Sequence, residues 1–166
     1  LGLDWSYEAV DVGEDELAGF VTSRDRDWRG LSLTMPLKRA VLPLLDHTDP
    51  FVGRSGVANT VVLDGGRCWG HNTDIPGATA ALRERGASGS NATVLGGGAT
   101  AASLVLALSD LGVSEIAVAA RDPRKAATVV TPEVLASVEA EVQFVPLADA
   151  PVAGERSSAT SSRSSR

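Results

Sequence analysis

Apolar and polar residues alternate with two different periods along the chain. Residues 5–12 alternate with period two, which predicts a β-strand, and residues 14–24 carry acidic side chains early and basic ones late, which favours a helix. Residues 30–34 are typical of a second strand, and Pro36 suits the first turn of a helix over 36–46. The pattern therefore predicts repeated units of strand followed by helix.

A β-hairpin is predicted in the middle of the chain. Residues 57–70, VANTVVLDGGRCWG, hold two short apolar runs around Asp64-Gly65-Gly66, and this combination is typical of a tight turn between strands. The next segment, GHNTDIPG at 70–77, is rich in residues that form turns. Residues 73–86 then predict a helix that ends at Gly86.

A glycine-rich segment begins the second half of the chain. In residues 92–112 an apolar strand runs into Gly96-x-Gly98-x-x-Ala101 and then into a long helix, and a second strand follows at 115–120. This context matches the dinucleotide-binding fingerprint, in which the first glycine permits a tight turn and the second lets backbone N–H groups approach a pyrophosphate. A purely structural glycine-rich turn is the alternative.

The residues after the second strand bear on which nicotinamide nucleotide is bound. An acidic residue there would hold the ribose 2′-hydroxyl, whereas arginine accepts a 2′-phosphate. Arg121 stands where the acid is expected, and Arg124 and Lys125 add positive charge, so the sequence favours NADP. Asp122 either caps a helix that begins at Pro123 or repels the phosphate and shifts the preference toward NAD.

Composition narrows the class of protein. The chain has 166 residues, of which 43% are hydrophobic, and a net charge of -6, so we expect a globular protein and no nucleic-acid partner. Cys68 is the single cysteine and is interpreted as a small buried hydrophobic residue. No secretory signal or long apolar span stands out, which favours a cytoplasmic protein without membrane contact. His47 and His71 are too few to indicate a metal site.

Five motifs together carry a resemblance to a known family. They are LSLTMPLK at 31–38, GVANTVV at 56–62, GHNTD at 70–74, VLGGGATAAS at 94–103 and AARDPRKA at 119–126. In this order and spacing the chain resembles the shikimate dehydrogenase family over nearly all of residues 1–150. The resemblance implies an α/β fold: an incomplete substrate-binding α/β domain over residues 1–80 that lacks its first strand, followed by a partial Rossmann-type NAD(P)-binding domain over 81–150. We expect a disordered Ser/Arg-rich tail over 151–166.

The family's activity is the reversible, NADPH-dependent reduction of 3-dehydroshikimate to shikimate in chorismate and aromatic amino-acid biosynthesis. The resemblance implies that Lys38 and Asp74 are catalytic, because a reduced carbonyl must gain a proton as the hydride arrives. It implies that Thr34, Asn59 and Asn72 bind the ring hydroxyls of the substrate. The residues expected to bind NADP are Gly96, Gly97, Gly98, Ala99, Thr100, Arg121 and Lys125. No metal is implied, and a homodimer is left open.

The chain also departs from the family pattern. Ser32 replaces a typical asparagine, and Ala120-Arg121-Asp122 replaces Asn-Arg-Thr. The family begins with a strand and a Ser-x-Ser segment that binds the substrate carboxylate, and it continues beyond Pro151; neither part is found in this sequence.

These departures leave three alternatives open: a quinate/shikimate dehydrogenase that uses NAD, a non-catalytic truncated remnant that retains at most nucleotide binding, and a folate-type dehydrogenase. Taken alone, Lys38 would be a solvated lysine, Asp74 a helix cap, and the two asparagines turn residues.

Overall fold

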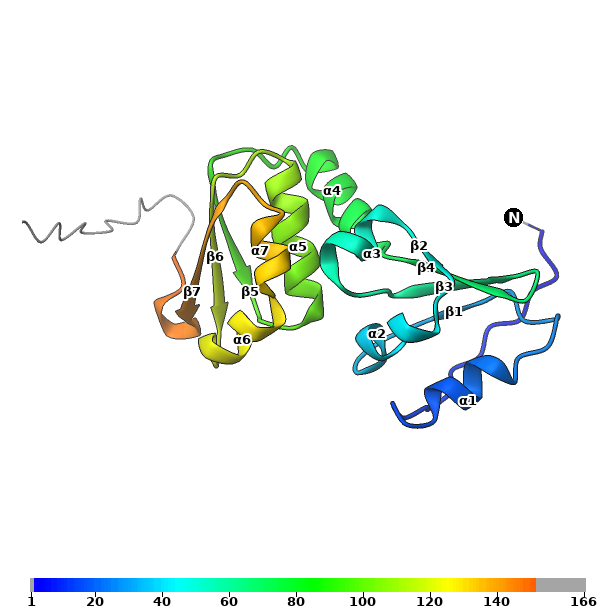
Figure 1. Cartoon of the computed structure of the whole chain (residues 1–166). Helices are drawn as coiled ribbons and strands as arrows, with labels where there is room; N and C mark the ends of the chain where they lie inside the picture. The colour runs from blue at the N-terminus through cyan, green and yellow to red at the C-terminus, as the bar shows by residue number, and fades with distance from the viewer. Residues whose placement is uncertain (1, 152–166) are drawn as a thin grey trace, which may run out of the picture. The chain divides into compact units, whose positions relative to one another are not determined.

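The computed structural model describes residues 2–151 and divides the chain into two compact units, Leu1–Thr73 and Asp74–Arg166 (Figure 1). Each unit has its own sheet, with strand order β1-β3-β4-β2 in the first unit and β5-β6-β7 in the second. The boundary that we predicted after residue 80 falls inside helix α4 (Asp74–Glu84), which belongs to the second unit. Apart from Pro151, the predicted tail lies outside the described residues.

The first unit is a small mixed sheet with short helices. Its elements are α1 (Leu17–Thr22), β1 (Gly30–Ser32), α2 (Leu37–Ala40), a 3-10 turn (Leu42–Leu44), β2 (His47–Thr48), α3 (Pro50–Ser55), β3 (Thr60–Asp64) and β4 (Arg67–His71). The predicted hairpin is present as β3 and β4, which pair antiparallel. Gly65 and Gly66 join them with φ of 57° and 78°, a conformation that glycine adopts without steric cost.

The core of the first unit lies on one face of this sheet. Along β3, Val61 is fully buried whereas Val62 is exposed, as expected when successive side chains point to opposite faces. Helices α1, α2 and α3 each contribute buried residues to the same cluster. The buried members of the cluster are Leu17, Val21, Leu33, Leu37, Val41, Val52, Ala58 and Val61.

The prediction of a strand over residues 5–12 is wrong. Residues 2–13 form neither helix nor strand in the structure, and the side chains of Trp5 and Tyr7 are 67% and 84% exposed. A strand needs a neighbour to accept its backbone hydrogen bonds, and none of the described strands pairs with this segment. Val12 is the member of the segment that packs against the core.

Two predicted helices are shorter in the structure than in the sequence pattern. The helix expected over 14–24 forms as α1, which covers Leu17–Thr22. The helix expected over 36–46 ends at Ala40, and Pro43 lies in a separate 3-10 turn. Proline lacks the N–H that a continuing α-helix requires, so its position explains the break.

The second unit confirms the predicted Rossmann-like α/β pattern. After α4, its elements are β5 (Asn91–Leu95), α5 (Ala99–Asp110), β6 (Glu115–Ala120), α6 (Pro123–Val129), α7 (Pro132–Ala136), β7 (Glu141–Pro146) and a 3-10 turn (Leu147–Asp149). The three strands are parallel. Figure 1 shows α5, α6 and α7 over one face of this sheet, as expected when successive crossovers keep one hand and move in one direction.

None of the helices within residues 2–151 combines the length and the apolar character needed to cross a membrane.

The close approach of β1 to β3 gives a test of the first unit. A side chain at Gly30 would collide with the backbone carbonyl of Val61, whereas no described atom lies within 4 Å of a side chain added at Gly19 in α1. We expect Gly30→Ala to destabilise the first unit by about 1–3 kcal/mol and Gly19→Ala to stabilise it by about 0.5–1 kcal/mol. Amide hydrogen exchange resolves the two units; equal stability of the two variants would contradict the strand register.

Candidate substrate and nucleotide sites

Backbone hydrogen bonds in the first unit bring three segments side by side. The Leu33 N–H donates to the carbonyl of Asn59 at 2.7 Å, and the Asn59 N–H donates to the carbonyl of His71 at 3.0 Å. The Ala58 N–H donates to the carbonyl of Lys38 at 2.9 Å. The segments 33–38, 58–60 and 71–73 are therefore neighbours, although they are far apart in the sequence.

Asn59 forms a side-chain pair with Thr73 at the junction of these segments. The Asn59 Nδ2 donates to Thr73 Oγ1 at 2.9 Å, and the Thr73 N–H donates to Asn59 Oδ1 at 3.0 Å. Asn59 is half-buried and Thr73 is exposed. Thr73 was not among the predicted site residues, although it lies between two of them in the motif GHNTD.

Thr34 and Lys38 lie at the beginning of α2. The carbonyl of Thr34 accepts a hydrogen bond from the Leu37 N–H at 2.8 Å, which fixes the turn that leads into the helix. Leu37 is buried in the core and therefore anchors the helix beside it. Thr34 is exposed and Lys38 is half-buried. Lys38 lies in this helix and Thr34 in the turn before it, and the backbone hydrogen bonds of Leu33 and Lys38 bring this segment beside residues 58–59.

Asn72 lies in a different environment from the other predicted substrate ligands. Its residue exposure is 1%. Its Nδ2 donates to Ser55 Oγ at 2.9 Å and to the carbonyl of Val57 at 3.3 Å. The Asn72 side chain, which the resemblance assigns to substrate binding, thus uses its Nδ2 group in hydrogen bonds within the first unit.

Asp49 supports the same region from the start of α3. Its Oδ1 accepts from the Val52 N–H at 2.8 Å and caps the helix, and its Oδ2 accepts from the Asn72 N–H at 3.2 Å. The Nδ1 of His71 lies 3.4 Å from Asp49 Oδ2. We did not predict α3 from the sequence; the pair Asp49-Pro50, a cap followed by proline at the first helical position, could have revealed it.

Asp74 is the first residue of α4 in the second unit. A carboxylate in the first turn of a helix is favoured by the helix dipole. The structure therefore places the second predicted catalytic residue immediately after Thr73 in the chain, at a helix start.

The three glycines of the fingerprint have different surroundings in the second unit. Gly96 has φ of 110°, a conformation that side chains rarely permit. A side chain at Gly97 would collide with the Cβ of Ala126 and meet the Cβ of Ala120 at 3.2 Å. Gly98 is the N-cap of α5, and no described atom lies within 4 Å of a side chain added there.

The residues expected to select the nucleotide lie just beyond β6. Arg121, Arg124 and Lys125 are all exposed. The Oδ1 of Asp122 accepts a hydrogen bond from the Lys125 N–H at 3.1 Å and caps α6. The structure therefore confirms that Asp122 is a helix cap, the first of the two roles considered for it.

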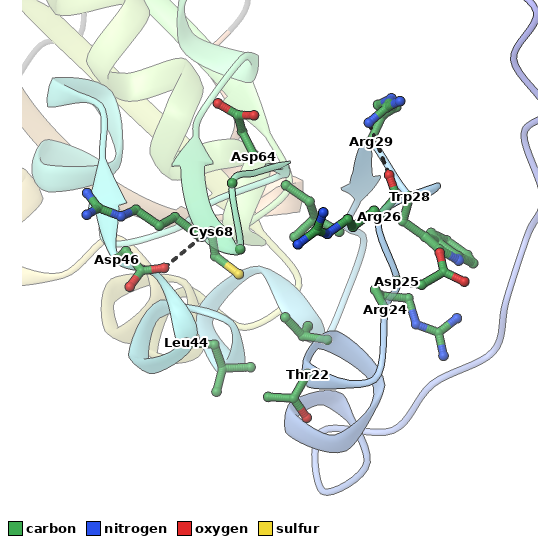
Figure 2. A pocket seen from close by; sticks show the side chains of 15 residues that line it. Thr22, Arg24, Asp25, Arg26, Trp28, Arg29, Leu44, Asp46, Asp64 and Cys68 are labelled. Carbon is green, nitrogen blue, oxygen red and sulfur yellow. Dashed lines mark hydrogen bonds between the residues drawn. The ribbon is translucent and has the colours of Figure 1, made fainter.

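A separate cleft of about 880 Å³ lies in the first unit between the end of α1 and the β3–β4 hairpin (Figure 2). Its charged lining residues have both signs: Arg24, Arg26, Arg29, Arg67, Asp25, Asp46 and Asp64. The guanidinium of Arg24 stacks 4.1 Å from the ring centroid of Phe20 and 4.7 Å from that of Trp28. None of the predicted site residues in the described chain lines this cleft.

Cys68 lies in this cleft and is half-buried rather than fully buried. Figure 2 shows the hydrogen bond from its backbone N–H to Asp46 Oδ2, at 2.7 Å. Burial, and next the negative charge of Asp46, raise the pKa of the Cys68 thiol. The thiol therefore stays protonated at neutral pH and is a poor nucleophile.

Residues 1–61 match the family model of the shikimate dehydrogenase substrate-binding domain. The chain is 41% identical over 127 residues to a shikimate dehydrogenase (NADP(+)) of Thermus thermophilus. The match covers 76% of this chain and 48% of that protein. Each of the solved structures below is likewise matched over about half of its own length.

Solved structures of shikimate 5-dehydrogenases are among those that resemble the present one. A shikimate 5-dehydrogenase of Listeria monocytogenes in complex with shikimate and NAD has a TM-score of 0.76 and 32% identity, and the match covers 89% of this chain and 53% of that one. The Thermus thermophilus enzyme in complex with NADP(H) and shikimate has a TM-score of 0.71 and 35% identity, with 86% and 52% covered. These matches include both units.

Among the residues that the structure describes, no three histidine, cysteine, aspartate or glutamate side chains gather as metal ligands would.

The Cys68 environment predicts slow alkylation by iodoacetamide. Because the pKa of the thiol is raised, the rate should continue to increase with pH beyond the ordinary cysteine titration. Asp46→Asn removes the nearby charge, so it should lower this pKa and speed alkylation at neutral pH, whereas Asp64→Asn on the same cleft serves as the control. Mass spectrometry gives the rates; equal rates in the wild type and Asp46→Asn would contradict the role of Asp46.

Proposed function

Because the chain belongs to the shikimate dehydrogenase family, we propose that it acts in the reversible, NADPH-dependent reduction of 3-dehydroshikimate to shikimate. The observation that carries the proposal is the meeting of segments 33–38, 58–60 and 71–73, because it gathers the matched polar residues of the family motifs in one place. The chain spans about half the length of the relatives that it matches.

In this proposal the substrate lies against Thr34 and Asn59. Hydroxyl and amide groups of this kind hydrogen-bond ring hydroxyls and discriminate against substrates that lack them. The pairing of Asn59 with Thr73 restrains the amide before the substrate arrives, so less conformational freedom is lost on binding. The resemblance also assigns Asn72 to the ring hydroxyls of the substrate, but this residue is buried.

Lys38 and Asp74 take part in proton transfer in the proposed reaction. The reduced nicotinamide supplies a hydride to the carbonyl carbon, and the carbonyl oxygen gains one proton. The Lys38 ammonium suits the donor of that proton and, once neutral, its acceptor in the reverse direction, while the Asp74 carboxylate suits a partner that holds and relays the proton. An ammonium beside the carbonyl oxygen also stabilises the negative charge that develops there.

The second unit supports nucleotide binding. Gly98 leaves open space at the start of the 12-residue helix α5, where backbone N–H groups and the helix dipole favour a pyrophosphate. In the proposal the loop residues Gly96, Gly97, Gly98, Ala99 and Thr100 surround this group. Arg121 and Lys125 would then take the 2′-phosphate of NADP, because both are exposed at the end of β6.

NAD is the second candidate nucleotide, since the Listeria monocytogenes structure was solved in complex with NAD. The geometry of Asp122 favours NADP, because this carboxylate is engaged at the start of α6 and the neighbouring charges are positive. A cytoplasmic location remains a prediction of the same proposal, which leaves a homodimer open.

Removal of the proposed proton donor or acceptor gives a direct test. With shikimate and NADP, we expect Lys38→Ala and Asp74→Asn to lower turnover by about 10²–10⁴-fold with little loss of NADP affinity. Arg39→Ala, the next residue of the same helix, is the control and should retain turnover. Reduced-nicotinamide absorbance measures the rate, and near-normal turnover in either variant would contradict its role. NADP binding without turnover in the wild type would support the remnant instead.

Substitutions at two glycines of the second unit separate nucleotide binding from folding. Gly98→Ala should keep the second unit folded but weaken NADP binding by about tenfold or more, because the added methyl occupies the space expected for the pyrophosphate. Gly77→Ala in α4, which also has no described atom within 4 Å of the added carbon, is the control. Calorimetric titration with NADP measures the affinity. Equal affinity of Gly98→Ala and the control would contradict the proposed position of the nucleotide.

A further inference from the structure

A buried polar link joins the end of β4 to helix α3. Its centre is Asn72, whose side chain donates to Ser55 Oγ at 2.9 Å and to the Val57 carbonyl at 3.3 Å. Ser55 is itself fully buried, and its hydroxyl lies 2.7 Å from the carbonyl of Phe51, to which it donates. The link is therefore shielded from solvent at both ends.

The position of the Asn72 amide is ill suited to substrate contact. A substrate hydroxyl could use the Nδ2 group as a donor only by replacing Ser55 Oγ or the Val57 carbonyl. Either replacement would take a hydrogen bond away from a buried acceptor, which is unfavourable. The Val57 carbonyl would keep the bond from Ser55 Oγ at 3.2 Å. Thr34, Asn59 and Thr73 are all more accessible than Asn72.

The same link controls the residues that follow Asn72. The Asn72 N–H donates to Asp49 Oδ2 at 3.2 Å, so both the backbone and the side chain of this residue are held. The next residue, Thr73, pairs with Asn59 through its N–H and its hydroxyl. Asp74 follows directly. A shift of Asn72 would therefore move Thr73 and disturb its pairing with Asn59.

We propose that Asn72 is a positioning residue and not a substrate ligand: with Ser55 and Asp49 it fixes the backbone from which Thr73 projects. The consequence for catalysis rests on the proposed function above. The positioning itself does not, because it concerns hydrogen bonds within the first unit.

Amide hydrogen exchange tests the positioning without substrate. Ser55→Ala removes one acceptor of the Asn72 side-chain amide, and Asn72→Ala removes that side-chain amide itself. In both variants we expect the exchange of the Thr73 amide to quicken by about tenfold or more, whereas the amide of Val61 in the core strand stays protected. Ser103→Ala, a fully buried serine in the second unit, is the matched control. Unchanged exchange at Thr73 in Ser55→Ala and Asn72→Ala would overturn the proposal.

Ser55→Ala also distinguishes a local effect from unfolding of the first unit, because it leaves Asn72 and its bond to the Val57 carbonyl in place. If Asn72→Ala exposes the Val61 amide as well, Ser55→Ala decides the outcome. Faster exchange at Thr73 with a protected Val61 supports positioning, and no difference from Ser103→Ala contradicts it.

Steady-state kinetics then separate positioning from ligation. We expect Ser55→Ala to lower kcat by about 10–100-fold, the effect of a small misplacement of catalytic groups, with less than about a threefold change in the KM for shikimate. Asn59→Ala, at a proposed substrate ligand, should instead raise KM. A raised KM in Asn72→Ala together with normal kcat in Ser55→Ala would overturn the proposal. Absence of turnover in the wild type would contradict the proposed function alone, since the exchange experiment still decides the positioning.

Discussion

The backbone hydrogen bonds of Asn59 hold the candidate substrate site together. Its carbonyl accepts from Leu33 and its N–H donates to His71, so this residue joins the segment before α2 to the segment after β4. Each bond is worth only about 1 kcal/mol net, but each is supported by the pairing of β1, β3 and β4. The side chains of the site therefore depend on the small sheet of the first unit.

This dependence explains why the polar residues of the site divide into two groups. Asn59 and Thr73 pair with each other near the surface, where a ligand can compete for their hydrogen bonds. Asn72 is instead buried, and its Nδ2 donates both of its hydrogen bonds to Ser55 and Val57. Neighbouring residues of one motif thus have different physical roles, because alternate residues of an extended chain face opposite sides.

The sequence pattern predicted those parts of the fold that depend on local interactions. The β3–β4 hairpin was predictable because Gly65 and Gly66 satisfy its turn, and the βαβ unit because its glycines and apolar runs follow one another closely. The strand expected over residues 5–12 needed a neighbouring strand to pair with. The alternation of apolar and polar residues does not show whether such a strand exists. The burial of Asn72 likewise depends on Ser55, a contact between distant positions that no spacing rule reveals.

The site residues were predicted from the family resemblance rather than from the pattern of apolar and polar residues. The structure shows that their environments differ. Thr34, Lys38 and Asn59 were found on neighbouring segments, whereas Asp122, which was ambiguous in the sequence, was found to cap α6. Thr73 and Asp49 were missed, since a threonine or aspartate beside a turn is usually explained by turn geometry alone.

We propose that shikimate binds where the segments 33–38, 58–60 and 71–73 meet. The most direct measurement is a titration of the ¹⁵N-labelled protein with shikimate, followed by amide chemical shifts. We expect saturable shifts at Thr34, Lys38, Asn59 and Thr73, and little change around Cys68 in the separate cleft. Saturable shifts confined to that cleft, or none at the three segments at millimolar shikimate, would contradict it.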